Sequence, residues 1–180
     1  MNHFSKSILA VKKSPLSLVA AFFILTSMSP HRANFSGKWK LNESKSIRGN
    51  ALCIYDQADR MRSEILKIAA KENFLIVDAM NTSSNSTQIA SEEKMAFDGK
   101  ETAITFKGKE KKFSAKWSNN DQTLIVNSVV YFNINNQKQE FRITEQWKLM
   151  NDGKSISVQA HAISNSFGER SWKFVYDKVI

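Results

Sequence analysis

The sequence has little cysteine, histidine, proline or glycine: one cysteine, three histidines, two prolines and six glycines in 180 residues. The lone Cys53 excludes an internal disulfide framework and a multi-cysteine zinc site, and three histidines leave little room for a histidine-rich metal centre. HExxH, CxxC, GxSxG, Walker and glycine-rich dinucleotide motifs do not occur. Hydrophobic residues make up 42% of the chain and aromatic residues 11%, which suits a folded core. We therefore expect one folded domain without a metal or cofactor.

The first 33 residues have the pattern of a secretory signal peptide. Met1–Ser14 carries three lysines and no acid, and the following Pro15–Met28 is almost entirely apolar or small. This apolar run is shorter than the roughly 20 residues that a membrane helix needs. Cleavage is expected within Ser29–Ala33, and an uncleaved anchor is the alternative.

Removal of this leader changes the charge of the molecule. The leader contains four of the 26 basic residues and none of the 17 acids, so the formal charge falls from +9 to +5. The expected mature domain, residues 34–180, keeps His161 as its one histidine. We expect an exported protein, periplasmic or extracellular, without a stable membrane span in the mature chain, and a buried Cys53.

From residue 35 onward, apolar and polar residues alternate with a period of two. In Phe141–Leu149, one face carries phenylalanine, isoleucine, glutamate, tryptophan and leucine, and the other face is polar. Asn, Asp and Gly separate such runs and tolerate the positive φ of tight hairpins. This pattern predicts ten strands, at 35–41, 64–69, 74–80, 87–97, 102–106, 110–117, 123–134, 140–150, 155–163 and 171–177.

Sequential antiparallel strands tend to close, because closure removes exposed edges. We therefore predict an all-β fold: a closed, up-and-down antiparallel barrel of about eight to ten strands. Residues 50–61 are expected to form a short helix or an irregular connection, and a helix reaching Ala70 is the alternative. A transmembrane ten-strand barrel is a minor alternative, against which the short turns at both ends argue.

The opening Phe35-Ser-Gly-Lys-Trp-Lys-Leu41 resembles the first strand of the calycin superfamily, in which lipocalins carry Gly-x-Trp and fatty-acid-binding proteins a similar Phe-x-Gly-Thr-Trp-Lys-Leu. It looks closer still to bacterial secreted lipocalin-like proteins that begin Ser-Gly-Thr-Trp-Lys-Leu-Asn, followed by a Lys-Ser, here Lys45-Ser46. The tail Val175–Lys178 is similar to the last strand of those families. The resemblance implies a lipocalin-like barrel.

The resemblance also implies roles for particular residues. Trp39 would be a structural plug across the base of the barrel, and Gly37 would let the chain approach its indole closely. Fatty-acid-binding proteins hold the ligand carboxylate with Arg-x-Tyr in the last strand, where this chain has Phe174-Val-Tyr176. The missing arginine argues against a fatty-acid carboxylate and for a neutral or aromatic ligand, or none.

Side-chain parity and size suggest which residues line the barrel interior. The candidates for a ligand-binding lumen are Phe113, Trp117, Tyr131, Phe141, Glu145, Trp147 and Tyr176. Glu145 shares its face with apolar residues, so it either orients a ligand or lies at the rim or beside a lysine. Asp78 is a similar case.

The remaining polar features have simpler interpretations. His161 is expected to face solvent, and the lysines between Lys107 and Lys116 are expected to form a solvated hairpin, which blunts a strand edge. Export makes nucleic acid an improbable partner.

These observations leave three functional hypotheses. The first is an exported lipocalin-like barrel that binds a small hydrophobic molecule without a covalent bond. The second is a non-enzymatic envelope or interaction protein with a solidly packed barrel. The third is an isomerase-type enzyme on the same scaffold, because fold alone does not decide function. The scarcity of catalytic motifs favours the first two, and no catalytic residue is assigned.

Overall fold

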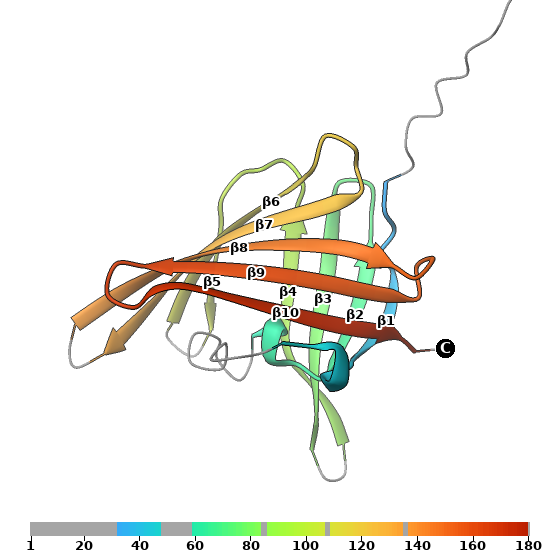
Figure 1. Cartoon of the computed structure of the whole chain (residues 1–180), viewed down its shortest axis with the longest axis horizontal. Coiled ribbons are helices and arrows are strands. Elements are labelled where there is room, and N and C mark those ends of the chain that lie inside the picture. Colours follow the sequence, from blue (N-terminus) through green and yellow to red (C-terminus); the bar gives the residue numbers. More distant parts are fainter. Residues whose placement is uncertain (1–31, 48–58, 84–85, 107–108, 135–136, 180) are drawn as a thin grey trace, which may run out of the picture.

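The computed structural model describes residues 32–47, 59–83, 86–106, 109–134 and 137–179. Cys53 and the leader residues 1–31 lie outside this part of the chain. Two short 3-10 helices, η1 (Glu43–Lys45) and η3 (Arg60–Arg62), lie between the first two strands (Figure 1). The described strands are β1 (Gly37–Leu41), β2 (Ile65–Ala70), β3 (Phe74–Ser83), β4 (Ser86–Ala96), β5 (Thr102–Phe106), β6 (Lys109–Trp117), β7 (Thr123–Ile134), β8 (Gln137–Met150), β9 (Ser155–Ser164) and β10 (Gly168–Lys178).

All ten strands form one antiparallel sheet, which curls into a nearly closed barrel. The order across the sheet is β4-β3-β2-β1-β10-β9-β8-β7-β6-β5. Strands that follow each other in sequence therefore pair, except for β4 and β5, and β1 also pairs with β10. The ends of the sheet, β4 and β5, are not hydrogen-bonded to each other. The predicted all-β, up-and-down antiparallel barrel is confirmed, and it is nearly closed. No helix in the described ranges is long and apolar enough to cross a membrane.

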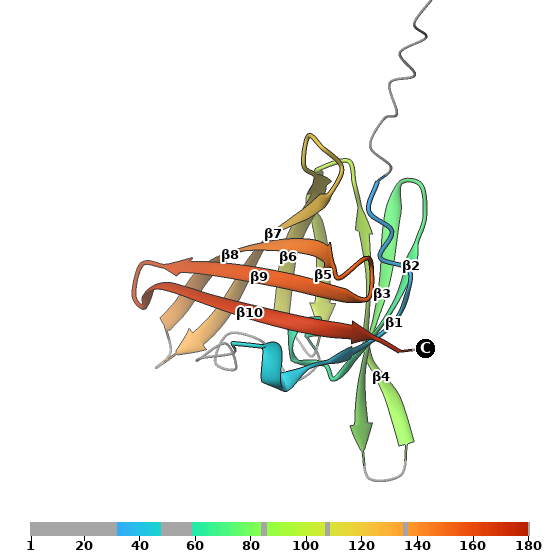
Figure 2. The same ribbon diagram turned by 45° about the vertical axis from the view of Figure 1, so that its right-hand side comes forward.

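The strand predictions hold closely: β1 begins two residues later than predicted, and the largest differences lie at hairpin ends. β8 and β10 each begin three residues earlier than predicted, and β3 ends three residues later. The β3–β4 hairpin extends beyond the neighbouring strands (Figure 2). At the starts of β8 and β10, backbone pairing continues among mostly exposed residues, so the alternation that marks a strand in sequence is lost there.

The sequence left residues 50–70 open between a helix and a strand, and the structure describes residues 59–70 of this segment. Ile65–Ala70 is the strand β2, and the alternative of a helix reaching Ala70 is wrong. Before it lies η3, which is capped by the Asp59 carboxylate accepting a hydrogen bond from the Met61 backbone N–H at 2.9 Å. Residues 48–58 lie outside the described part of the chain.

Trp39 closes one end of the barrel, which we call the base; the opposite end is the mouth. The Trp39 indole is fully buried and donates a hydrogen bond to the Phe35 carbonyl at 2.9 Å. Phe35 in turn stacks on Trp117 with ring centroids 5.6 Å apart. Gly37 has φ +141°, and a Cβ there would lie 3.2 Å from Cε of Lys178 and 3.6 Å from Nε1 of Trp39. The positive φ favours glycine at this position, whereas a Cβ 3.6 Å from the indole would make only an ordinary contact. The role of Trp39 as a structural plug stays a prediction.

Candidate functional site

The alternation in β8 brings a carboxylate into the middle of the barrel. Phe141, Ile143, Glu145 and Trp147 are buried, whereas the residues between them are exposed. Glu145 is completely buried, and its register partners Val126 in β7 and Ala160 in β9 are buried as well. An isolated charge in such surroundings would be strongly destabilising, so Glu145 requires a partner.

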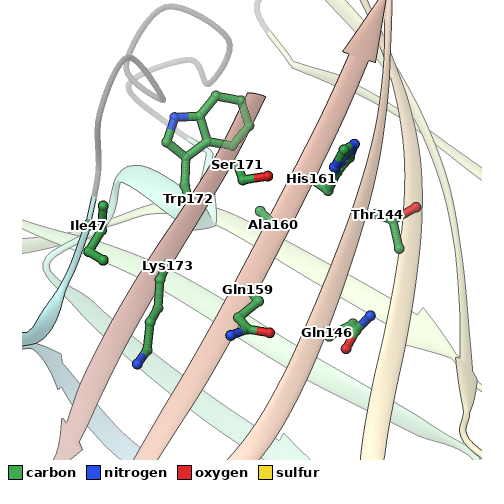
Figure 3. Close-up of a pocket in the computed structure, with 9 residues that line it drawn as sticks. All are labelled: Ile47, Thr144, Gln146, Gln159, Ala160, His161, Ser171, Trp172 and Lys173. Atoms are coloured by element: carbon green, nitrogen blue, oxygen red, sulfur yellow. The ribbon is translucent and has the colours of Figure 1, made fainter. Parts of the chain in front are cut away.

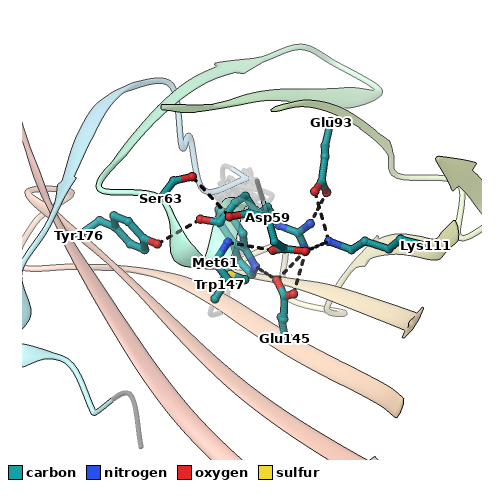
Figure 4. A network of polar contacts seen from close by, with 9 residues as sticks. Asp59, Met61, Ser63, Glu93, Lys111, Glu145, Trp147 and Tyr176 are labelled. Atoms are coloured by element: carbon teal, nitrogen blue, oxygen red, sulfur yellow. Dashed lines mark hydrogen bonds and ion pairs between the residues drawn. The ribbon is translucent and has the colours of Figure 1, made fainter. Parts of the chain in front are cut away.

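That partner comes from the connection between β1 and β2. The Arg60 side chain is fully buried and its Nη2 donates to both carboxylate oxygens of Glu145 at 2.8 Å. Its Nη1 pairs with Glu93 of β4. The guanidinium thus joins β4 and β8, which lie on opposite sides of the gap between β4 and β5. Figure 4 shows the two acids, Glu93 and Glu145, on opposite sides of the network.

A second cation completes the cluster. Nζ of Lys111 in β6 lies 2.8 Å from Asp59 and 3.2 Å from Glu93. Asp59, Arg60, Glu93, Lys111 and Glu145 together form what we call the buried ion network. It contains three carboxylates and two cations, so each cation among these residues is held by two carboxylates.

Mutual attraction outweighs burial in setting the pKa values of Asp59, Arg60 and Lys111. Burial alone would lower the pKa of Arg60, but Glu145 and Glu93 raise it further, and the net pKa is raised. Burial would raise the pKa of Asp59, but Lys111 and Arg60 lower it overall. Burial and Arg60 would lower the pKa of Lys111, but Asp59 and Glu93 raise it overall. All three groups are therefore held in their charged forms.

Two aromatic residues fix the network in place. Trp147 Nε1 donates to Oε2 of Glu145 at 2.9 Å, and the Arg60 guanidinium carbon lies 5.8 Å from the centroid of its ring. The Tyr176 hydroxyl donates to the Arg60 carbonyl at 3.4 Å. Three of the predicted lumen residues, Glu145, Trp147 and Tyr176, thus meet around Arg60.

The other predicted lumen residues are spread along the barrel. Phe113 is buried in the interior, and Phe141 is buried where it stacks on Phe167, with ring centroids 5.6 Å apart. Trp117 is half-buried at the base. Phe174, which stands where the fatty-acid-binding pattern has arginine, is buried.

Tyr131 does not belong to the interior, and its prediction as a lumen residue is corrected here. In β7, Leu124, Val126, Ser128 and Val130 are the buried residues, so Tyr131 lies on the outer face. There the Lys138 ammonium lies 3.9 Å from the centroid of its ring. Both faces of this strand are apolar in sequence, so parity did not identify the inward one.

Above the network, on the mouth side, three hydroxyl groups on inward-facing residues have no hydrogen-bond partner. They belong to Ser91, Ser128 and Ser164, and their Oγ atoms are buried. Ser128 pairs in register with Phe113 and Ile143, two residues from the level of Glu145. The Nε atom of Arg60 is likewise buried and unpaired. Buried polar atoms without partners are uncommon and mark places where a water or ligand is accommodated.

Parity in the sequence could have located part of the network. Lys111 shares its face with Phe113, Ala115 and Trp117, yet it was grouped with the solvated lysines; its side chain is only 10% exposed. Glu93 shares parity with Met95 in the same way. No sequence signal pointed to Arg60, because its position inside the barrel depends on the path of the connection and not on a strand pattern.

The two remaining polar candidates face outward. His161 is half-exposed, and its Nε2 lies 3.6 Å from Glu169. Asp78 is half-buried on the outer face of β3, with one carboxylate oxygen buried and unpaired. Within the described ranges, no group of histidine, cysteine, aspartate or glutamate side chains could hold a metal ion.

Comparison with known proteins rests on structure alone. No protein-family model matches the sequence, and a search of curated proteins finds no significant match. A secretory abundant heat soluble protein from Ramazzottius varieornatus superposes with a TM-score of 0.53 at 13% identity, covering 80% of this chain and 94% of that protein. The two proteins share a fold. The low identity carries no further statement about function.

Two further barrels are more distant. A zebrafish ileal bile acid-binding protein, solved with cholic acid, has a TM-score of 0.49 at 15% identity and covers 81% of this chain and 98% of that chain. A luciferase domain from the dinoflagellate Lingulodinium polyedrum has a TM-score of 0.48 at 11% identity, covering 80% and 41%.

Proposed function

We propose that this barrel binds a small, uncharged, largely hydrophobic molecule in its mouth half, without a covalent bond. The observation that carries the proposal is the set of unpaired inward hydroxyls, Ser91, Ser128 and Ser164, within an apolar wall. A ligand with an apolar body and a few hydrogen-bonding groups would satisfy these hydroxyls while burying its own surface.

The buried ion network argues for a neutral ligand over an anionic one. The guanidinium of Arg60 is shared by Glu93 and Glu145, and the ammonium of Lys111 is shared by Asp59 and Glu93. A ligand carboxylate would have to displace one of these carboxylates and leave it buried without a partner. Phe174 points to the same conclusion, because it stands where fatty-acid-binding proteins carry the arginine that holds a ligand carboxylate.

The same network disfavours proton-transfer chemistry. Glu145 is fully buried and accepts hydrogen bonds from Arg60 and Trp147. Its two oxygens are therefore already engaged as acceptors. The arrangement suits a structural anchor better than a general acid or base.

A solidly packed barrel with an interaction role is the second candidate. It is favoured by the base half, where large side chains such as Trp39, Trp147 and Phe174 are almost completely buried against one another. This candidate predicts that no apolar probe enters the protein.

Fluorescence titration separates these candidates. We expect the neutral probe Nile red to bind and the anionic probe cis-parinaric acid to bind more weakly. Ser128→Phe should abolish Nile red binding by filling the space beside Phe113, whereas Ile125→Phe, on the outer face of the same strand, should not. Thermal unfolding would establish that both variants fold, and Ser128→Leu is the smaller replacement if the phenylalanine is not tolerated.

Failure of Nile red to bind would favour the solid barrel. Tighter binding of cis-parinaric acid would contradict the argument from the ion network. Native mass spectrometry of protein purified from its own source would then identify any ligand that is retained.

Export is part of the proposal. It rests on the basic and apolar pattern of the first 33 residues. We propose a periplasmic or extracellular barrel in which the β1–β2 connection, through Arg60 and Met61, fills part of the interior.

A further inference from the structure

The outer face of the sheet is hollowed where β6 to β10 cross it. Two adjoining hollows of about 430 and 400 Å³ share Thr144 and His161 among their linings. We call this continuous depression the outer trough. Most of its lining residues are outward ones that alternate with buried residues along each strand, and a few buried residues, among them Ala160 and Ile143, lie at its floor.

A row of uncharged or weakly charged polar side chains crosses the trough from strand to strand. The register pairs Ser114 with Asn127, Asn127 with Thr144, Thr144 with His161, and His161 with Ser171. Five neighbouring strands thus contribute one hydrogen-bonding residue each. At about 4.8 Å between strands, the row is about 19 Å long.

A second, shorter row lies beside the first. Gln146 pairs with Gln159, and Gln159 pairs with Lys173; their side chains lie next to one another on three adjacent strands (Figure 3). Both glutamines are exposed. Amides supply donors and acceptors together, and neither glutamine is needed to cover the core.

The residue composition of the outer trough differs from that of the outer face of β1 and β2. On β1 and β2 the outward positions include Lys38, Lys40 and Lys67, which are the usual residues of a solvated sheet face. The trough combines a concave shape with a concentration of amide and hydroxyl groups. Ordinary solvation accounts for neither property.

Two of the three lysine and arginine side chains that line the trough are paired with acids, and Lys173 has no ion pair among the described residues. Arg142 pairs with Glu140 at 2.7 Å, Lys112 with Glu101 at 3.7 Å, and His161 lies 3.6 Å from Glu169. A polyanion such as a nucleic acid binds by neutralising phosphates with free cations. The paired charges therefore favour an uncharged ligand over a polyanion.

We propose that the outer trough binds a neutral, linear oligosaccharide that runs across the strands. Sugar hydroxyls both donate and accept hydrogen bonds, which matches the amides and hydroxyls of the two rows. The C–H faces of the sugar rings would rest on the half-exposed Ile163 and Val129 at one end of the trough. An extended saccharide chain also advances, per ring, by roughly the distance between neighbouring strands.

The test is titration of the isotope-labelled protein with cellohexaose, chitohexaose and maltohexaose, followed by amide chemical-shift mapping and calorimetry. We expect at least one hexasaccharide to shift amides of β7 to β10 on both sides of Thr144. The double variant Gln146→Ala/Gln159→Ala should weaken binding by about tenfold or more. The matched control, Lys38→Ala/Lys67→Ala, removes a cross-strand pair from the outer face of β1 and β2 and should leave binding unchanged.

Titrations at two salt concentrations and with a polyanion test the alternative that the outer trough binds a nucleic acid. Binding of a neutral sugar should be the same at low and moderate salt, and an oligothymidylate of six nucleotides should not compete. The proposal is overturned if no hexasaccharide shifts these amides at millimolar concentration, if the double variant binds as tightly as the parent, or if the oligothymidylate binds more tightly and is released by salt. Shift mapping on the unmodified protein keeps the test valid if a variant fails to fold. Nile red bound in the interior should not compete with the sugar, so this proposal and the proposed function fail independently.

Discussion

At the scale of single residues, Arg60 has the largest structural role among the polar side chains. Its guanidinium is completely buried and pairs with Glu93 and Glu145, and its backbone carbonyl accepts a hydrogen bond from Tyr176. Burial of such ions costs several kcal/mol each, which paired geometry offsets. Removal of the arginine alone would leave two carboxylates in the interior with only Lys111, Asp59 and Trp147 around them.

We therefore expect Arg60→Met to destabilise the barrel by about 3–5 kcal/mol, as for other buried pairs that lose one partner. Urea unfolding monitored by tryptophan fluorescence measures this loss. Arg142→Met is the matched control, because Arg142 pairs with Glu140 on the exposed outer face and its removal should have a much smaller effect. Equal losses for the two variants would show that the buried ion network does not stabilise the fold.

At the scale of elements, the connection between β1 and β2 is the part of the barrel that joins distant strands. Asp59 caps η3 and binds Lys111 of β6, while Arg60 binds β4 and β8. Two residues of the connection, Asp59 and Arg60, are thus tied to β4, β6 and β8, none of which pairs with β1 or β2. Its attachment is electrostatic, so it should depend on pH.

The pH dependence has a definite sign. The pKa of Asp59 is lowered from the ordinary 3.8, so its contribution to stability is present above pH 3.8 and is lost as the pH falls through the lower folded value. Asp59→Asn keeps an acceptor for the Met61 N–H but removes the charge. We expect this variant to be less stable than the parent at neutral pH and the difference to shrink below pH 3.8, measured by urea midpoints. Asp152→Asn, in the exposed turn after β8, should show no such convergence.

Hairpin elements were the most predictable part of the chain, and the contrast with the connection has a physical cause. In β8 the alternation of Phe141, Ile143, Glu145 and Trp147 with polar residues reports directly which face is buried. Arg60 has no such pattern, because one residue in an irregular segment is positioned by three partners that are distant in sequence. Tyr131 marks the intermediate case, in which a strand is recognised but two apolar faces conceal its orientation.

At the scale of the whole molecule, the boundary of the folded unit lies earlier than the expected mature domain, residues 34–180. The Ala33 N–H donates to the Asp121 carbonyl at 3.0 Å, and the Arg32 guanidinium donates to the Glu72 carbonyl at 3.0 Å. The same guanidinium lies 5.3 Å from the ring centroid of Trp117. Arg32 and Ala33 thus pack onto the base of the barrel.

We propose that a leader, if removed, is cleaved before Arg32, within the first part of the range Ser29–Ala33 suggested by the sequence. A chain beginning at Arg32 should be more stable than one beginning at Asn34 by about 1 kcal/mol, which is the usual size of one cation–π contact and one or two partly exposed hydrogen bonds. Arg32→Ala in the longer chain separates the side-chain contribution from that of the Ala33 backbone bond. The intact mass of protein secreted after expression of the full chain gives the cleavage position directly. If the mature chain begins at Asn34 and is as stable as the longer chain, the folded unit begins at residue 34, as the sequence alone predicts. If the chain stays in the cytoplasm with its first 33 residues intact, the proposal of export is contradicted.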